Sequence, residues 1–99
     1  FALVTFSGQE EGQVLRGAAV FRDSLNAWLR QVPEEKCSVL GPAPCVVPKV
    51  NYNYRYQLTL RCHMTRPLRQ LLAALLRKFS QDKANRGVNA YSDVNGYDM

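Results

Sequence analysis

Residues 54 to 61 alternate strictly between apolar and polar side chains, and no other feature constrains the fold as strongly. The apolar positions are Tyr54, Tyr56, Leu58 and Leu60. The polar positions between them are Arg55, Gln57, Thr59 and Arg61. Because successive side chains of a strand point to opposite faces, this period of two predicts a strand with one buried face and one face in solvent.

An apolar strand and a long helix are predicted before this segment. Residues 1–6 are almost all apolar, which is typical of a central strand, and we expect Ser7 and Gly8 to end it. From residue 10 to about residue 31, apolar side chains recur at helical spacing. Pro33 is expected to end this helix, because proline removes a backbone donor and clashes with the preceding turn.

A second helix and a last strand are predicted after the alternating segment. Thr65 is a suitable N-cap residue, and Pro67 fits the first turn of a helix. Asn85 and Gly87 are expected to stop this helix, and residues 88–94 are predicted to form a strand. The large aromatic side chains of the two helices are expected to lie in the core: Phe21, Trp28 and Phe79.

Residues 37–50 are apolar but are interrupted by three prolines, at positions 42, 44 and 48. Proline cannot donate a hydrogen bond to a neighbouring strand, so this segment is predicted to be an edge strand. We expect it to bend or break near Gly41, and residues 51–53 to form the turn that follows.

The predicted order of elements is therefore βαββαβ. Right-handed crossovers would place both helices on one face of a four-stranded antiparallel sheet. This is an α+β fold of the ferredoxin-like type, in which the second and fourth strands occupy the edges. The prolines of residues 37–50 agree with the edge position of the second strand.

Neither a metal centre nor a catalytic centre is predicted. The chain has three cysteines, Cys37, Cys45 and Cys62, and one histidine, His63. Zinc sites use four ligands in closely spaced pairs, and no such spacing occurs, so buried thiols are the favoured interpretation. Cys62 and His63 are sequence neighbours on a predicted strand and would point to opposite faces, which does not favour a nucleophile and base pair. No segment approaches the length of a membrane span.

Positive charge is concentrated in the second half of the chain. Residues 1–47 carry four Lys/Arg against five Asp/Glu, a net charge of −1, whereas residues 48–99 carry nine against three, a net charge of +6. A basic half favours polyanionic partners such as nucleic acid or acidic peptide tails. An ordinary solvated surface remains the alternative.

Two basic surfaces are predicted within this half. The first is the open face of the sheet, and its candidate nucleic-acid-binding residues are Lys49, Arg55, Gln57 and Arg61. The second is the start of the second helix, where backbone N–H groups attract anions, with Arg66, Arg69 and Gln70 as candidates for binding an acidic tail. An RNA-recognition motif would stack bases on open-face aromatics. Tyr54 and Tyr56 share the buried parity instead, so this interpretation is not favoured.

Three segments, in order and at matching spacing, resemble the C-terminal domain of the PriA family of replication-restart helicases. They are Leu40-Gly41-Pro42-Ala43-Pro44, Tyr54-Arg55-Tyr56-Gln57-Leu58 and Asp93-Val94-Asn95. Gly96 departs from the family, which usually has proline after this ending. The resemblance covers essentially the whole chain.

The resemblance implies that residues 1–99 are the single C-terminal accessory domain of a larger cytoplasmic DNA helicase. It implies binding to branched or single-stranded DNA, to the acidic tail of single-stranded DNA-binding protein and to the helicase core of the same chain. ATP and zinc would be bound upstream, and this domain would be non-catalytic and hold no cofactor. The alternative is a docking module that packs on the helicase core and has no DNA affinity of its own.

Overall fold

The computed structural model describes residues 2–32, 37–50, 52–62 and 65–93, with the side chains of residues 46–50 outside the description. The elements follow one another as β1 (Ala2–Gly8), α1 (Glu11–Gln31), β2 (Cys37–Val50), β3 (Asn53–Cys62), α2 (Arg66–Gln81), a 3-10 turn (Lys83–Asn85) and β4 (Val88–Asp93). The predicted order βαββαβ is confirmed.

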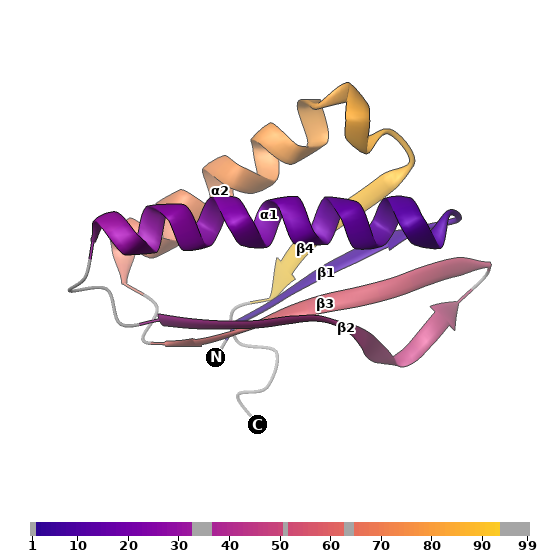
Figure 1. Ribbon diagram of the computed structural model, residues 1–99, viewed down its shortest axis with the longest axis horizontal. Helices are drawn as coiled ribbons and strands as arrows, with labels where there is room; N and C mark the ends of the chain where they lie inside the picture. The colour runs from indigo at the N-terminus through magenta and orange to yellow at the C-terminus, as the bar shows by residue number, and fades with distance from the viewer. Residues whose placement is uncertain (1, 33–36, 51, 63–64, 94–99) are drawn as a thin grey trace.

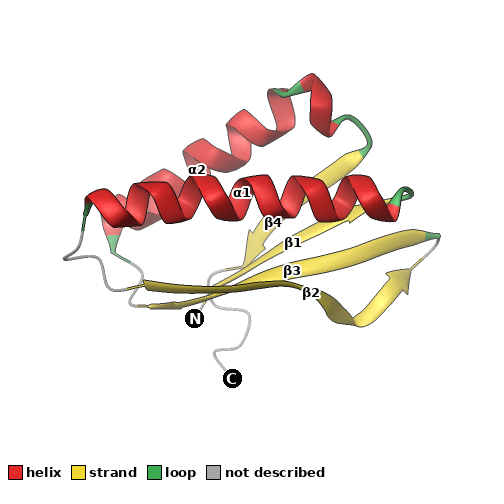
Figure 2. Ribbon diagram, viewed as in Figure 1, coloured by secondary structure: helices red, strands yellow, loops and turns green. Residues whose placement is uncertain are grey.

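The four strands form one antiparallel sheet in the order β2-β3-β1-β4. Both α1 and α2 cover the same face of this sheet, and neither of them lies on the other face (Figure 1, Figure 2). The ferredoxin-like α+β fold is thereby confirmed. The second and fourth strands lie at the edges, as the ferredoxin-like order predicted, and the prolines of β2 agree with the edge position of that strand.

Three phenylalanine rings form the centre of the core between the sheet and the helices. Phe6 of β1 packs edge-on against Phe21 of α1 and Phe79 of α2, with ring centroids 5.4 Å apart in both pairs. The core assignment of Phe21 and Phe79 is confirmed, and Trp28 packs against the same cluster while only partly buried. One aromatic from each of three elements therefore joins both helices to the central strand.

The predicted end of the first strand is wrong. The strand continues through Ser7 and Gly8, because Gly8 still pairs with Tyr54 of β3 on one side and with Val88 of β4 on the other. Glycine suits this position for a steric reason, since a Cβ atom on Gly8 would lie 2.7 Å from the carbonyl oxygen of Gly87. Gly8, the residue expected to end the strand, therefore permits β1 to pass close to Gly87, the residue before β4.

The start of α2 is confirmed and its predicted end is wrong. The hydroxyl of Thr65 accepts a hydrogen bond from the Leu68 N–H at 3.3 Å, which is the expected cap. The helix stops at Gln81, before Asn85 and Gly87, because Asp82 adopts an extended conformation and its carboxylate accepts from the Ala84 N–H. Asn85 still contributes, since its side-chain amide donates to the Phe79 carbonyl at 3.1 Å.

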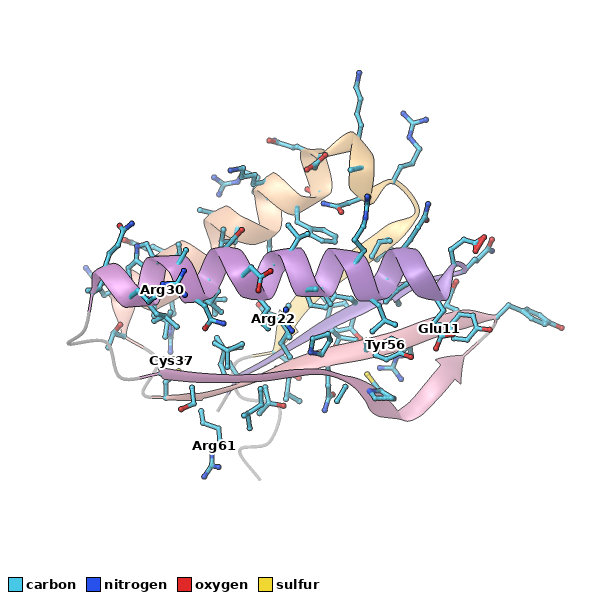
Figure 3. The ribbon with its side chains drawn as sticks, in the orientation of Figure 1. Glu11, Arg22, Arg30, Cys37, Tyr56 and Arg61 are labelled. Atoms are coloured by element: carbon cyan, nitrogen blue, oxygen red, sulfur yellow. The ribbon has the colours of Figure 1, made fainter. Side chains whose placement is uncertain are left out.

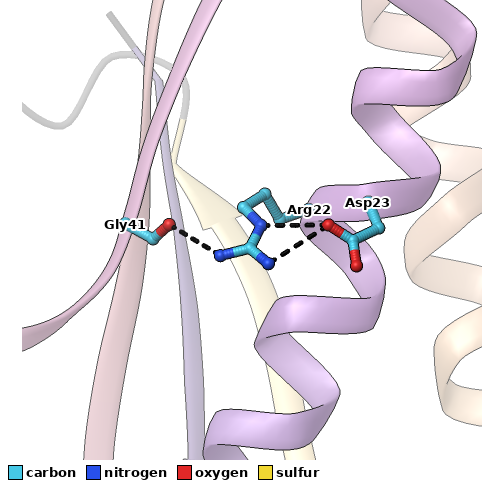
Figure 4. Close-up of polar contacts among 3 residues, drawn as sticks. All are labelled: Arg22, Asp23 and Gly41. Carbon is cyan, nitrogen blue, oxygen red and sulfur yellow. Dashed lines mark hydrogen bonds and ion pairs between the residues drawn. The ribbon is translucent and has the colours of Figure 1, made fainter.

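The helix α1 ends at Gln31 as predicted, while Pro33 lies outside the described residues. Arg22, near the middle of α1, ties the helix to the edge strand β2. Its guanidinium donates to the Gly41 carbonyl at 3.3 Å and forms an ion pair with Asp23 at 3.1 Å (Figure 4). The bend expected near Gly41 is present as a register shift between Leu40 and Ala43.

Candidate nucleic-acid interface

The alternation of β3 places its polar residues on the open face of the sheet. Leu58 and Leu60 are fully buried under the helices, so the residues of β3 that alternate with them lie on the opposite face. Arg61 points away from both helices (Figure 3). The predicted placement of Arg55, Gln57 and Arg61 on the open face therefore agrees with the structure, whereas their role in binding stays a prediction.

Strand register determines which open-face side chains are neighbours. Thr5, in the middle of β1, lies between Gln57 of β3 and Tyr91 of β4. Its large neighbours leave it only 7% exposed, although it lies on the face opposite α1 and α2. The adjacent rows are Arg55–Ser7–Asn89 and Thr59–Leu3–Asp93. Residues from three strands that are far apart in the sequence thus form one continuous surface.

A bulge in β2 borders one side of this surface. The register of β2 against β3 shifts between Pro44 and Lys49, and the strand turns away from the helices there (Figure 1). Cys45, at the start of the bulge, is buried and borders an open depression. The residues that line the depression come from all four strands: Leu3, Thr5, Cys45, Arg55, Gln57, Tyr91 and Asp93.

Among the described residues that line this depression, Arg55 is the cation. Its Nη2 donates to the hydroxyl of Tyr91 at 3.4 Å, and this hydrogen bond raises the pKa of Arg55. Burial raises the pKa of the Cys45 thiol, and the nearby charge of Arg55 opposes that effect. Both shifts keep each group in its ordinary state near neutral pH, namely a charged guanidinium and a neutral thiol.

Tyr91 is an open-face residue that was not among the predicted site residues. Tyr91 lies on this face with 49% of its surface exposed, so an aromatic side chain is available there for stacking. A signal was present in the sequence. Val88 and Ala90 of β4 pack against the core, so Tyr91 shares the outward parity of Asn89 and Asp93.

Arg61, another predicted residue of this face, lies apart from the depression. Arg61 is six residues along β3 from Arg55, which corresponds to roughly 20 Å in a strand. The backbone of Lys49 pairs with Tyr54, but the Lys49 side chain lies outside the described part of the chain. Of the four predicted residues, the structure therefore brings Arg55 and Gln57 together and sets Arg61 at the far end of the strand.

Tyr56 belongs to the helix side of the sheet and has a different partner. Its hydroxyl donates to a carboxylate oxygen of Glu11 at 2.5 Å, which joins β3 to the first turn of α1 (Figure 3). This hydrogen bond is the main reason that the pKa of Tyr56 is raised above its ordinary value. Tyr56 is therefore engaged in holding α1 on the sheet.

The second predicted surface, at the start of α2, presents three exposed side chains: Arg66, Arg69 and Gln70. Arg66 and Gln70 are four residues apart and share one side of the helix. The backbone contributes less than expected, because Pro67 has no N–H and the N–H of Leu68 is bonded to Thr65. A ligand here would be held mainly by the guanidinium and amide side chains.

Two further properties concern the described residues alone. No three His, Cys, Asp or Glu side chains within this part of the chain are grouped closely enough to hold a metal ion. Because His63 lies outside the described residues, the expectation that the chain has no zinc site stays a prediction. Neither α1 nor α2 combines the length and apolar character needed to cross a membrane.

The topology and surfaces define a small α+β domain of the ferredoxin-like class with arginines on an open sheet face. A family model described as the primosomal protein N C-terminal domain (PriA_C) matches residues 1–97. The chain belongs to this family and is therefore a domain of a primosomal replication-restart protein, which confirms the resemblance seen in the sequence. Comparison with curated proteins gives no match.

Proposed function

We propose that the domain binds DNA through the open face of its sheet, as a non-catalytic module of a replication-restart helicase. The observation that carries the proposal is the depression in which Arg55 and Gln57 lie together, on the sheet face opposite α1 and α2. Membership of a primosomal family supports DNA as the polyanion. In this proposal the helicase activity, ATP and zinc belong to other parts of the parent protein.

Phosphate contacts would supply most of the affinity. Arg55 and Arg61 lie at opposite ends of one strand, roughly 20 Å apart, so a nucleic-acid strand along β3 would meet a cation at each end. Contacts to phosphate are independent of sequence and release counterions, so they weaken as salt rises. The same face would therefore serve branched or single-stranded DNA without sequence preference.

Charge reversal on β3 should weaken DNA binding. We expect Arg55→Glu and Arg61→Glu each to raise the Kd for labelled single-stranded or forked DNA roughly tenfold, and to reduce the slope of log Kd against log salt by about 1. Fluorescence anisotropy of the 99-residue chain across a salt series measures both quantities. Arg30→Glu is the matched control, since it makes the same charge change on α1, away from the open face.

Equal losses in all three variants would show that only net charge matters and would contradict a site on the open face. A Kd for the unmutated chain that does not respond to salt would contradict the phosphate mechanism. If the chain binds no DNA even at low salt, the domain acts as a docking module on the helicase core instead.

The exposed side chains at the start of α2 support a second candidate function. Arg66 and Gln70 share one side of the helix and could hold a carboxylate-rich peptide, such as the acidic tail of single-stranded DNA-binding protein. Arg69 is exposed in the same turn and adds a second cation. This surface belongs to the helix layer, so its ligand would not compete with DNA bound on the open sheet face.

Arg66→Glu is therefore expected to weaken binding of an acidic tail peptide at least roughly tenfold, because it removes an attraction and adds a repulsion at the same point. Gln70→Ala should weaken it less, since it removes a neutral donor. Anisotropy with a labelled peptide measures both. Arg77→Glu is the control on the same helix, about 16 Å farther along. Equal loss of peptide and DNA affinity in Arg66→Glu would indicate one shared site and contradict two separate surfaces.

A further inference from the structure

Tyr91 gives the open face an exposed aromatic ring, which phosphate binding does not require. We propose that its ring stacks against a base of single-stranded DNA, so that the domain contacts bases as well as phosphates and prefers single strands. This inference rests on the proposed function and names the form of DNA and the residue that selects it.

The position of Tyr91 favours stacking over a role in the core. Its neighbour across the sheet, Thr5, is 7% exposed, whereas Tyr91 itself is 49% exposed. Val88 and Ala90 of the same strand fill the core side, so the Tyr91 ring is not needed there. A half-exposed tyrosine beside a depression supplies the flat apolar surface on which bases stack.

The hydrogen bond from Arg55 holds the Tyr91 ring next to a positive charge. The Tyr91 hydroxyl accepts from Arg55 at 3.4 Å, which holds the phenol end of the ring beside the guanidinium. A base over the ring would therefore have a cation within reach of its backbone phosphate. Gln57, in the row of Thr5 and Tyr91, adds an amide that can both donate to and accept from a base edge.

The chemistry of the depression indicates single strands. Bases of a duplex are stacked on one another, so they cannot lie on a tyrosine that stands on a sheet face, whereas bases of a single strand can turn outward. The lining also includes the apolar side chain of Leu3, which suits the apolar face of a base. Such stacking is tolerant of sequence because every base has a flat face.

The test compares two oligonucleotides of equal length and equal phosphate number, oligo(dT) and an abasic strand. The unmutated chain should bind oligo(dT) about 5- to 140-fold more tightly, the range expected for one stacked base. Tyr91→Ala should remove this preference while its affinity for the abasic strand changes little. Tyr91→Phe keeps the ring and should keep the preference. Tyr52→Ala is the matched control, because Tyr52 is 81% exposed in the turn between β2 and β3.

A second readout does not depend on affinity or on the stability of a variant. In the unmutated chain, NMR ring resonances of Tyr91 should shift upfield when oligo(dT) binds and stay unchanged with the abasic strand. Tyr91→Leu, which keeps an apolar strand residue without a ring, repeats the test if Tyr91→Ala unfolds. Equal affinity of the unmutated chain for both strands would overturn the stacking while leaving phosphate binding intact. Binding of neither strand would overturn the proposed function itself.

Discussion

Replacement of Phe6 by alanine should lower the free energy of unfolding by about 3–5 kcal/mol. Phe6 is fully buried in the central strand, and it makes edge-on contacts with Phe21 and Phe79 at 5.4 Å. Its removal would leave a cavity that touches both helices, and it would also remove two aromatic pairs. A domain of this size is stable by only about 5–15 kcal/mol, so the variant would lose much of its stability.

Thermal or urea unfolding followed by circular dichroism measures this loss. The midpoint temperature should fall by about 4–8 °C for each kcal/mol lost. Phe6→Leu should cost less because it leaves a smaller cavity. Val20→Ala is the surface control, since Val20 is 56% exposed on α1, and its effect should stay within about 0.5 kcal/mol. A loss below about 1 kcal/mol for Phe6→Ala would contradict the central position of the three-ring cluster.

Gly8→Ala should destabilise the domain by about 1–3 kcal/mol. The added methyl group would lie 2.7 Å from the Gly87 carbonyl oxygen and 3.1 Å from Cγ2 of Val14. The first of these atoms is backbone, so the clash can be relieved only by moving β1 away from the segment that leads into β4. We expect the pairing of Gly8 with Val88 to weaken, and hydrogen exchange of the β4 amides should become faster.

Gly12→Ala is the matched control for this substitution, with an expected effect of opposite sign. Gly12 lies in the first turn of α1, and a Cβ atom there would meet no heavy atom within 4 Å. Alanine should therefore stabilise the domain by about 0.4–1 kcal/mol, because it restricts the unfolded chain and favours the helix. If Gly8→Ala were also neutral or stabilising, the close approach of Gly8 to Gly87 would be contradicted.

The depression on the open face connects these stability predictions to function. Gly8 and Phe6 hold β1 between β3 and β4, and β1 carries Leu3 and Thr5 on the opposite face. A shift of β4 away from β1 would also separate Tyr91 from Arg55. We therefore expect the preference for oligo(dT) to be more sensitive to Gly8→Ala than the affinity for an abasic strand.

The sequence by itself determined the order of the strands and helices and which face of β3 is buried. The alternation in β3 assigned Leu58 to the core and Arg55 to the open face, and the prolines of β2 assigned that strand to an edge. The Thr65 cap was likewise visible. These features depend on periods of two or about 3.6 residues and on the chemistry of single residues, which are local properties of the chain.

Only the tertiary structure decided which residues of different strands are neighbours. Arg55 and Tyr91 are 36 residues apart, and they meet because β1 lies between their strands in a particular register. Gly8 continues its strand because two partners pair with it, although glycine alone favours a break. Register and strand order depend on long-range packing of the whole core, and no single segment of the sequence specifies that packing. The residues of the candidate interface were therefore partly predictable, but their assembly into one site was not.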